Sequence, residues 1–477
     1  MMAEHENDQA PAPSRKLHIA MFPWLAFGHM MPFLHLAKLI AQKGHQLSFL
    51  STPLNIDRLL TSLVSSSDDA ISMIHFVKLQ FHRHPSLPEK AEATADVTYK
   101  QVHYLFESFD WLQDEITLFL KTSKPDWIIQ DFASHWLGPI AHQLGTRCAF
   151  FSVYKATSMI HVSPPKELCG FGDYRTKPED YTTPPKWIPF PSNLTMHLYE
   201  VLRIMDNMEP DNTGLSPYDR AGGVVLNSDT ILIRSCYELE SRWLNLLQTL
   251  YRKPVLPIGL LPAVIDPAKK DRDTTWEPIK TWLDRQNKSS VVYVAFGSET
   301  KPSQSELTEL ALGLEMSKLP FFWALKTRRG LADDEPIKLP EGFVNRVGER
   351  GMVSTSWVPQ LKVLSHGSVG GVLFHSGWST VIEAVQFGKS MVVVPLQSDQ
   401  PLVARFMEAD QLGYCLPRDE KDGRFTKEAV AAGVRLVMVE EEGRVYREKV
   451  MEMKDLFADL NMQDRYVESM LEHMVLG

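Results

Sequence analysis

The sequence predicts an α/β protein with two similar halves, each built around a parallel sheet. Apolar runs of strand length alternate with amphipathic segments at helical spacing, which is the pattern of βαβ units. These runs are nearly continuous in apolar residues, as expected of parallel strands covered on both faces. The chain of 477 residues also exceeds the usual size of a single hydrophobic core, so two domains are expected.

The first half contains the expected strands and one long irregular loop. The strands are predicted at residues 17–24, 45–52, 71–79, 127–131, 148–153 and 231–235. A loop with Gly28 and His29 follows the first of them, and amphipathic helices are predicted over 32–43 and 238–251. Seven prolines between Pro164 and Pro191 interrupt the alternation over residues 161–192. Such a long loop inside a compact domain is usually functional or mobile.

The second half repeats the alternation. Strands are predicted at residues 291–296, 321–326, 352–357, 369–374 and 391–394. The first of these ends at Gly297-Ser298, and a capping box from Ser303 to Glu306 predicts a helix that runs to about Lys318. A ligand is expected at the carboxyl ends of the strands, in the cleft between the halves.

Five segments are predicted along the chain. They are a disordered tail (1–14), an N-terminal domain (15–253), a linker rich in Pro, Lys and Asp (254–275), a C-terminal domain (276–455) and a final helical segment (456–477). The tail is polar and Pro-rich, unlike a signal peptide.

The composition excludes several classes of protein. The formal charge of −9 argues against nucleic-acid partners and anionic membranes, which need concentrated positive charge. The four cysteines have no short spacing, so a zinc site or a disulfide framework is not expected. No apolar run is long enough to span a membrane, and we expect no stable membrane insertion. A cytoplasmic protein is the simplest interpretation.

Several common motifs are missing from the sequence. There is no dinucleotide-binding fingerprint, no Walker A sequence, no nucleophile elbow and no zinc-protease motif. His82 and His84 form an H-x-H pair, but without other ligands at suitable spacing a solvated loop is the better interpretation.

The chemistry is concentrated between residues 357 and 400. An apolar strand leads into His375, and small residues then open a helix that ends near Gly388. A helix N-terminus with the hydroxyls of Ser379 and Thr380 beside it would suit a phosphate. The alternative, equally compatible with the sequence, is that Ser376 and Ser379 only cap the helix.

The same segment resembles the nucleotide-sugar signature box of plant family 1 glycosyltransferases. It runs for 44 residues from Trp357 to Gln400, the length of that box, and contains W-V-P-Q, H-S-G-W and D-Q at the matching positions. The resemblance implies the GT-B architecture, in which two Rossmann-like domains face an interdomain cleft. It also implies a last helix that crosses back onto the first domain, and we expect a monomer.

The resemblance implies a role for each position of the box. Trp357 and Val358 would contact uracil, and Gln360 and Glu383 would hold the ribose. The diphosphate would be held by His375, Gly377, Trp378, Ser379 and Thr380, with Ser298 as a second contact, and the donor sugar by Asp399 and Gln400. One departure is visible: the family usually has C-G-W-N-S where this chain has S-G-W-S-T, so Ser379 is a shorter polar arm than the usual Asn.

The first half also resembles the family where its catalytic residues lie. His29, in W-L-A-F-G-H, matches the general base, and Asp131 matches the carboxylate that orients it. An imidazole that titrates near neutral pH can take the proton of an acceptor hydroxyl, and a carboxylate on its other nitrogen fixes the tautomer. The implied reaction is a single displacement at C1 of the sugar with inversion. UDP-sugar is a co-substrate, and neither a cofactor nor a metal is expected.

The acceptor is less well defined by the sequence. Residues 87–97 (L-P-E-K-A-E-A-T-A-D-V) resemble a segment of one branch of the family, which adds a sugar to an existing terpenoid, steroid or flavonoid glycoside. Trp24, Phe27 and Trp136 are expected acceptor contacts, and the loop 161–192 an acceptor wall. Gln400, the last residue of the box, suggests UDP-glucose as the donor, and UDP-rhamnose is the alternative donor. Transfer directly to an aglycone, a UDP-sugar epimerase or phosphorylase, and a non-catalytic UDP-sugar-binding protein are the alternatives.

Overall fold

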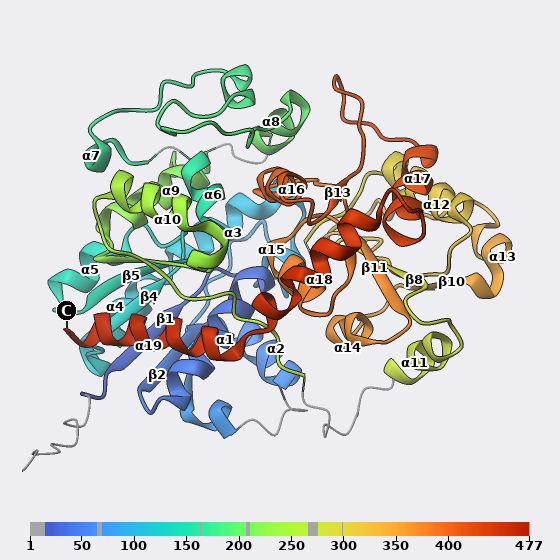
Figure 1. The fold of residues 1–477 in the computed structure, drawn as a ribbon. Helices are drawn as coiled ribbons and strands as arrows, with labels where there is room; N and C mark the ends of the chain where they lie inside the picture. The colour runs from blue at the N-terminus through green and yellow to red at the C-terminus, as the bar shows by residue number, and fades with distance from the viewer. Residues whose placement is uncertain are drawn as a thin grey trace, which may run out of the picture.

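Two parallel sheets, one in each half of the chain, form the two lobes seen in Figure 1. The structure is a computed structural model that describes residues 15–63, 69–162, 164–206, 210–265, 275–297 and 299–476. Helices cover both sheets, and most of the residues in the central strands are buried and apolar, as expected of parallel strands. The α/β class and the two-domain GT-B arrangement are as the sequence predicts.

The sheet of the first lobe has the order β3-β2-β1-β4-β5-β6-β7 among the described residues, and every pair is parallel. Its strands are β1 (His18–Phe22), β2 (Gln46–Ser51), β3 (Ile74–Lys78), β4 (Trp127–Gln130), β5 (Arg147–Ser152), β6 (Thr230–Ile233) and β7 (Val255–Pro257). The direction of strand succession reverses between β1 and β4, so the loops after these two neighbouring strands open the crevice where ligands bind in such sheets.

The sheet of the second lobe repeats this plan with the order β10-β9-β8-β11-β12-β13 in the described part of the chain. Its strands are β8 (Val291–Ala295), β9 (Phe321–Ala324), β10 (Gly351–Ser354), β11 (Val369–Phe374), β12 (Ser390–Val393) and β13 (Tyr414–Cys415). Here the order reverses between β8 and β11.

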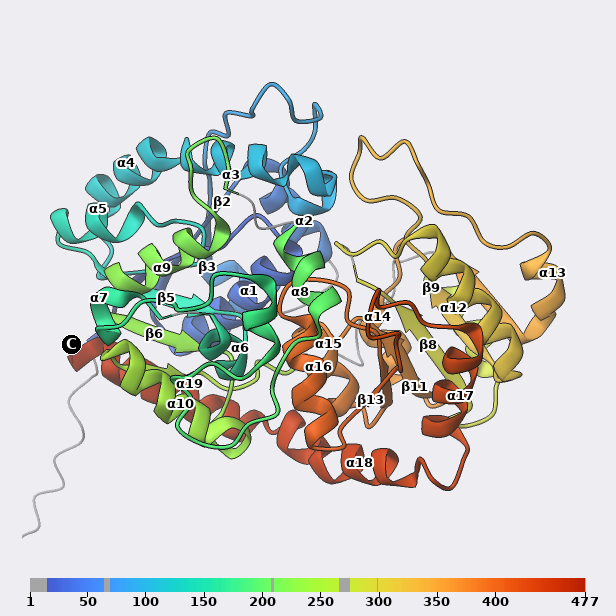
Figure 2. The ribbon, with the colours of Figure 1, turned by 90° about the horizontal axis from the view of Figure 1, so that it is seen from above.

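The helices connect the strands and cover the sheets (Figures 1 and 2). Those of the first lobe are α1 (Phe27–Gln42), α2 (Pro53–Leu63), α3 (Val102–Asp110), α4 (Gln113–Ser123), α5 (Leu137–Gln143), α6 (Ala156–His161), α7 (Lys166–Cys169), α8 (Leu198–Met205), α9 (Pro217–Asn227) and α10 (Tyr237–Tyr251). The later helices are α11 (Trp276–Asp284), α12 (Gln304–Ser317), α13 (Phe343–Val347), α14 (Gln360–Ser365), α15 (Trp378–Gln386), α16 (Gln400–Ala409), α17 (Lys427–Met438), α18 (Arg444–Ala458) and α19 (Leu460–Leu476). The predicted capping box is present, since Ser303 Oγ accepts from Glu306 N at the start of α12.

Helix α1 begins earlier than the sequence predicts. Pro32 suggested a first helical position, where proline is common, but it lies inside the helix, which starts at Phe27 after the extended residue Ala26. His29 therefore sits in the first turn of α1 and not in a loop. The rigid start of a helix fixes the direction of its side chain.

The predicted linker, 254–275, overlaps the first sheet. Residues 255–257 form β7, the edge strand beside β6, because Val255 and Leu256 pair with Ile231 and Leu232. The polypeptide therefore leaves the first lobe later than residue 254.

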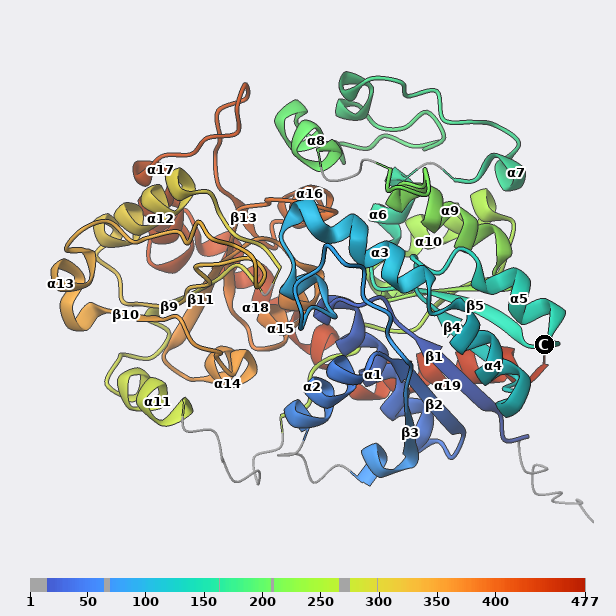
Figure 3. The same cartoon turned by 180° about the vertical axis from the view of Figure 1, so that it is seen from behind.

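The last helix crosses from the second lobe to the first. Helix α18 packs on α15, whereas α19 runs beside α1, as the red helix in Figures 1 and 3 shows. Val467, Met470 and Met474 of α19 are buried in the apolar cluster that includes α1. The Trp127 indole N–H donates to the Met474 carbonyl at 3.0 Å, which ties the end of α19 to β4.

Helix α8, which follows the irregular loop of the first lobe, is attached to the second lobe. Glu200 pairs with Arg405 of α16, and Arg203 pairs with Glu306 of α12. Apolar side chains of α8 also pack on Leu402 of α16. Helix α8 lies beside α16 in both Figure 1 and Figure 3, so this helix bridges the lobes.

Candidate active site

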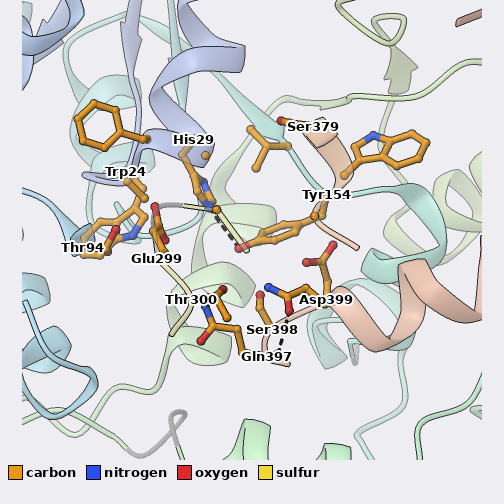
Figure 4. Close-up of a pocket in the computed structure, with 18 of the residues that line it drawn as sticks. Trp24, His29, Thr94, Tyr154, Glu299, Thr300, Ser379, Gln397, Ser398 and Asp399 are labelled. Atoms are coloured by element: carbon orange, nitrogen blue, oxygen red, sulfur yellow. Dashed lines mark hydrogen bonds between the residues drawn. The ribbon is translucent and has the colours of Figure 1, made fainter. Parts of the chain in front are cut away.

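A cavity of about 2230 Å³ lies between the lobes at the carboxyl ends of both sheets. Its lining comes from the residues that follow β1, β4 and β5 in the first lobe and β8, β10, β11 and β12 in the second. Since the strand order reverses in both sheets here, the cavity occupies the expected ligand crevice. Figure 4 shows side chains of both lobes that line it.

The side chains of His29 and Asp131 meet on the first-lobe side of the cavity. Their elements, α1 and the turn after β4, are brought together because β1 and β4 are neighbours. His29 Nδ1 lies 2.9 Å from Asp131 Oδ2, and only 9% of His29 and 1% of Asp131 are exposed. The same carboxylate accepts the backbone N–H groups of Trp24 and Phe132 at 3.0 and 2.7 Å. Every oxygen of Asp131 is therefore engaged, and the imidazole is held by a fixed carboxylate.

The electrostatics of this pair favour a basic imidazole. Burial lowers the pKa of His29, but the adjacent Asp131 carboxylate outweighs burial and raises the pKa above the usual 6.5. Asp131 accepts a hydrogen bond from Nδ1–H, so in the neutral ring Nε2 carries no proton and is the basic nitrogen on the side of the cavity.

Tyr154, in the turn after β5, lies against this nitrogen. Its hydroxyl is 3.3 Å from His29 Nε2, and its ring packs edge-on against the imidazole at a centroid distance of 5.5 Å. Burial and the nearby Asp399 raise the pKa of Tyr154 well above 10, so the phenol stays protonated and donates. Figure 4 shows Tyr154 between His29 and the loop of Asp399.

On the second-lobe side, the imidazole of His375 stands between two close glycines. A Cβ at Gly297 would lie 2.9 Å from His375 Cε1, and one at Gly377 would lie 2.7 Å from His375 Nε2. Gly297 also has a positive φ of 73°, so both steric space and backbone conformation require glycine there. Burial lowers the pKa of His375 to about 4, and the imidazole is therefore neutral near pH 7.

The start of helix α15 shows that Ser376 and Ser379 are not helix caps. The cap residue is Gly377, without a side-chain cap bond. Ser376 Oγ donates to the Gln400 carbonyl at 2.8 Å, which joins the loop after β11 to the start of α16. Ser379 Oγ instead accepts from Arg234 Nη1 at 2.6 Å, and Ser379 lines the cavity.

Three predicted donor residues form a connected group farther along the cavity. Gln360 Nε2 donates to Glu383 Oε2 at 2.6 Å and to Thr380 Oγ1 at 3.3 Å. Burial raises the pKa of Glu383 above its usual value. Trp357 and Val358 line the same end, and Trp357 is 68% exposed, an unusual state for a tryptophan. An uncovered indole beside this polar group is suited to stacking on a flat ligand.

Asp399 and Gln400 occupy the turn between β12 and α16. Burial raises the pKa of Asp399 to about 6, and its Oδ2 accepts from Ser158 Oγ of the first lobe at 3.5 Å. Gln400 Oε1 accepts the backbone N–H groups of Leu396 and Gln397 at 2.9 and 3.0 Å. The carbonyl end of Gln400 thus shapes the turn.

Of the three aromatic residues expected to contact the acceptor, two lie at the cavity. Trp24 and Phe27 line the cavity, and the Trp24 ring stacks on Phe106 at 4.3 Å. Trp136 does not line it in the described part of the chain: its indole N–H donates to Asp110 in the core of the first lobe. The structure therefore does not bring Trp136 to the cavity with the other two aromatic residues. Ser298, the predicted second phosphate contact, lies outside the described residues.

The irregular loop contributes to the cavity wall, as the sequence predicts. The lining includes Pro164, Pro165, Arg175 and Tyr181. Arg175 organises this wall, since its guanidinium binds the Asp173 carboxylate and the His161 carbonyl and stacks on Tyr181 at 4.1 Å.

Sequence reasoning missed Tyr154 and Arg234. Tyr154 follows a strand, a position that sometimes signals function, but nothing in the sequence brings it to His29. Arg234 follows β6 and is joined to Ser379 across 145 residues, so no local pattern could reveal the contact. Among the described residues no group of His, Cys, Asp and Glu side chains suits a metal ion, and none of the helices there is long and apolar enough to cross a membrane.

Comparison with known proteins agrees with this arrangement. Residues 225–468 match the family model described as UDP-glucoronosyl and UDP-glucosyl transferase. UDP-glycosyltransferase 91A1 of Arabidopsis thaliana is 52% identical over 96% of this chain and 97% of its own length. Soyasaponin III rhamnosyltransferase of Glycine max is 40% identical over 96% of this chain and 95% of its own.

A solved structure shows the same fold. The UGT73P12 structure of Glycyrrhiza uralensis, complexed with glycyrrhetinic acid 3-O-monoglucuronide, superimposes with a TM-score of 0.77 at 22% identity, covering 96% of each chain. Together with the sequence relatives, the fold and the two-sided cavity show that the chain belongs to the plant family 1 UDP-glycosyltransferases.

Proposed function

We propose that this UDP-glycosyltransferase moves a hexose, glucose or rhamnose, from UDP to a sugar hydroxyl of a lipophilic plant glycoside, with inversion. The observation that carries the proposal is the buried His29–Asp131 pair, which faces the donor-box residues across one cavity. The first lobe would hold the acceptor and the second lobe the donor, so a single chain would supply both binding sites. We further propose that the enzyme acts as a cytoplasmic monomer without a metal.

In the proposed mechanism, His29 is the general base. Its Nε2 takes the proton of the acceptor hydroxyl as that oxygen attacks C1 of the donor sugar, and Asp131 stabilises the imidazolium through Nδ1. The C1–O bond to the diphosphate breaks as the new glycosidic bond forms, on opposite faces of C1. The proton stays on His29 and UDP carries away the electron pair.

The donor would lie along the second lobe. Trp357 and Val358 would contact uracil, Gln360 and Glu383 the ribose, and Asp399 and Gln400 the sugar. The diphosphate would lie at the start of α15, against His375, Gly377, Trp378, Ser379 and Thr380, where backbone N–H groups stabilise developing negative charge. The glycine pair around His375 allows the imidazole to lie directly against the backbone of both loops, which fixes this side chain at the start of α15.

Two observations support a glycoside acceptor. The cavity volume of about 2230 Å³ exceeds the several hundred to about 1,000 Å³ of an ordinary small-molecule site, so a donor and a glycosylated acceptor fit together. The relative from Glycine max is named as a rhamnosyltransferase of soyasaponin III. Direct transfer to an aglycone is the second candidate, since Trp24 and Phe27 offer an apolar acceptor surface beside His29.

The test is a transfer assay with UDP-glucose and UDP-rhamnose, each against a panel of aglycones and their glucosides. We expect acceptor-dependent UDP release, faster with glucosides, and an inverted anomeric centre in the product. The control variant is His82→Ala, which changes an exposed histidine outside the cavity lining and should keep full activity. UDP release at the same rate with and without acceptor, or no UDP release with any acceptor, would contradict the transferase proposal. Preference for aglycones would favour the second candidate.

A further inference from the structure

Arg234 is a buried cation that reaches from the first lobe into the donor side of the site. It follows β6, and only 4% of it is exposed. Its Nη1 donates to Ser379 Oγ at 2.6 Å, while Nε and Nη2 donate to the carbonyls of Leu260 and Leu261 at 2.9 and 3.4 Å. The guanidinium therefore ends on a serine hydroxyl at the first turn of α15.

The charge of this guanidinium has no close counter-ion in the part of the chain that the structure describes. Among the described residues, Glu383 is the carboxylate that acts on Arg234, and it does so through its charge without a hydrogen bond to the guanidinium. Burying an unpaired charge is costly, and a carboxylate partner is the usual remedy. By contrast, the buried Arg220 contacts both Asp110 and Asp211. A buried guanidinium without a carboxylate partner, close to a ligand cavity, would be stabilised by the negative charge of a bound ligand.

The geometry also fixes what Ser379 can do. Because its oxygen accepts from Arg234, its own proton is available to a ligand oxygen in the cavity that Ser379 lines. The indole N–H of Trp378 donates to the Arg234 carbonyl at 3.0 Å, so the residue before Ser379 is held as well. Arg234 itself is not in the cavity lining, and it acts from behind the serine.

We infer that Arg234 is a positioning residue for the donor diphosphate, which acts through Ser379. The inference rests on the proposed donor site at the start of α15. Arg234 orients the hydroxyl of Ser379 toward a phosphate oxygen and adds positive charge behind the helix N-terminus. It thereby takes the place of the longer asparagine arm that the family usually has at position 379.

The experiment compares ligands that share uridine and differ in phosphate. UDP, UMP and uridine are titrated by calorimetry into the wild-type chain and into Arg234→Met, Arg234→Lys and Ser379→Ala. For Arg234→Met we expect UDP affinity to fall by about 10- to 100-fold, the value of a charge-assisted hydrogen bond, with uridine affinity unchanged. The UDP affinity of Ser379→Ala should fall by a similar factor. The double variant, Arg234→Met with Ser379→Ala, should bind UDP only slightly more weakly than either single variant, because both changes remove the same interaction. Arg234→Lys should recover part of the loss.

Arg350→Met is the matched control. The Arg350 guanidinium also donates to backbone carbonyls, those of Leu314, Glu315 and Leu319, but it lies outside the cavity lining. Its loss should lower thermal stability and leave the UDP-to-uridine affinity ratio unchanged.

Equal weakening of UDP and uridine in Arg234→Met would show that Arg234 only joins the lobes, and unchanged UDP affinity would likewise overturn the inference. If Arg234→Met does not fold, the affinity ratios of Arg234→Lys and Ser379→Ala decide. Tight UDP binding without sugar transfer to any acceptor would contradict the proposed function while leaving this inference standing.

Discussion

The two sides of the cleft satisfy their polar groups in different ways. In the first lobe, the Asp131 carboxylate already has three hydrogen-bond donors, and His29 has a partner on each nitrogen. On the side of the second lobe, His375 is neutral between two glycines, and Trp357 is exposed. Ser379 there accepts a hydrogen bond from Arg234, a buried cation of the first lobe. The proposed catalytic pair is thus held in place by the protein alone, whereas the proposed donor site would be completed by its ligand. Variants on the first-lobe side should therefore lower mainly kcat, whereas variants on the second-lobe side should weaken mainly donor binding.

The largest effect is expected for His29→Ala. Removing the base should lower kcat by about 10²- to 10⁴-fold, the usual contribution of general base catalysis, with UDP affinity unchanged because the donor side is intact. Steady-state rates together with a UDP titration measure both quantities. If His29→Ala kept wild-type turnover, the base would lie elsewhere.

Asp131→Asn should rank second and should also move the pH profile. The reaction needs neutral His29, whose pKa is raised above 6.5 by Asp131, so the wild-type rate falls as the pH falls through that raised value. Without the carboxylate, the pKa of His29 drops and the acidic limb shifts to lower pH, while kcat decreases by about 10²-fold or more because the tautomer is no longer fixed. The measurement is kcat/KM from pH 5 to 9. The Asp399 carboxyl has a pKa of about 6 and is still present in this variant. If the acidic limb of the profile did not shift, the limb would therefore arise from another group, such as Asp399.

Glu383→Ala tests the donor side. The loss of a buried partner of Gln360 should raise KM for the UDP-sugar by roughly 10-fold, with kcat little changed, since the ribose is held equally in the ground and transition states. Initial rates at varied donor concentration separate the two constants. A fall in kcat at constant KM would instead place Glu383 in the chemical step.

Tyr154→Phe should have the smallest effect on transfer. Its hydroxyl lies 3.3 Å from His29 Nε2, so its loss should expose the proposed base to water and raise acceptor-independent UDP release by a few-fold, about the value of one hydrogen bond. The packing of the ring is kept by phenylalanine. UDP release with and without acceptor measures the ratio, and an unchanged ratio would mean that the phenol does not shield the base.

Local pattern was sufficient to predict the alternating elements, the capping box at Ser303 and the segment 357–400. It misplaced the start of α1 because Pro32 resembles a first helical residue, and it missed the short edge strands β7 and β13, which have too few residues for a pattern. The direction of Trp136 and the contacts of Tyr154 and Arg234 depend on how distant turns meet. Such contacts arise from tertiary packing, which no spacing in the sequence encodes.

Helix α8 has a consequence for exchanging parts between relatives. This helix, which follows the irregular loop, is attached to the other lobe by the Glu200–Arg405 and Arg203–Glu306 pairs. A chimera that takes the loop together with α8 from another enzyme would therefore separate these charges from their partners and detach this segment from the second lobe. A transplant that is meant to change acceptor choice should carry the facing residues of α12 and α16 with it, so the smallest exchangeable unit includes parts of both lobes.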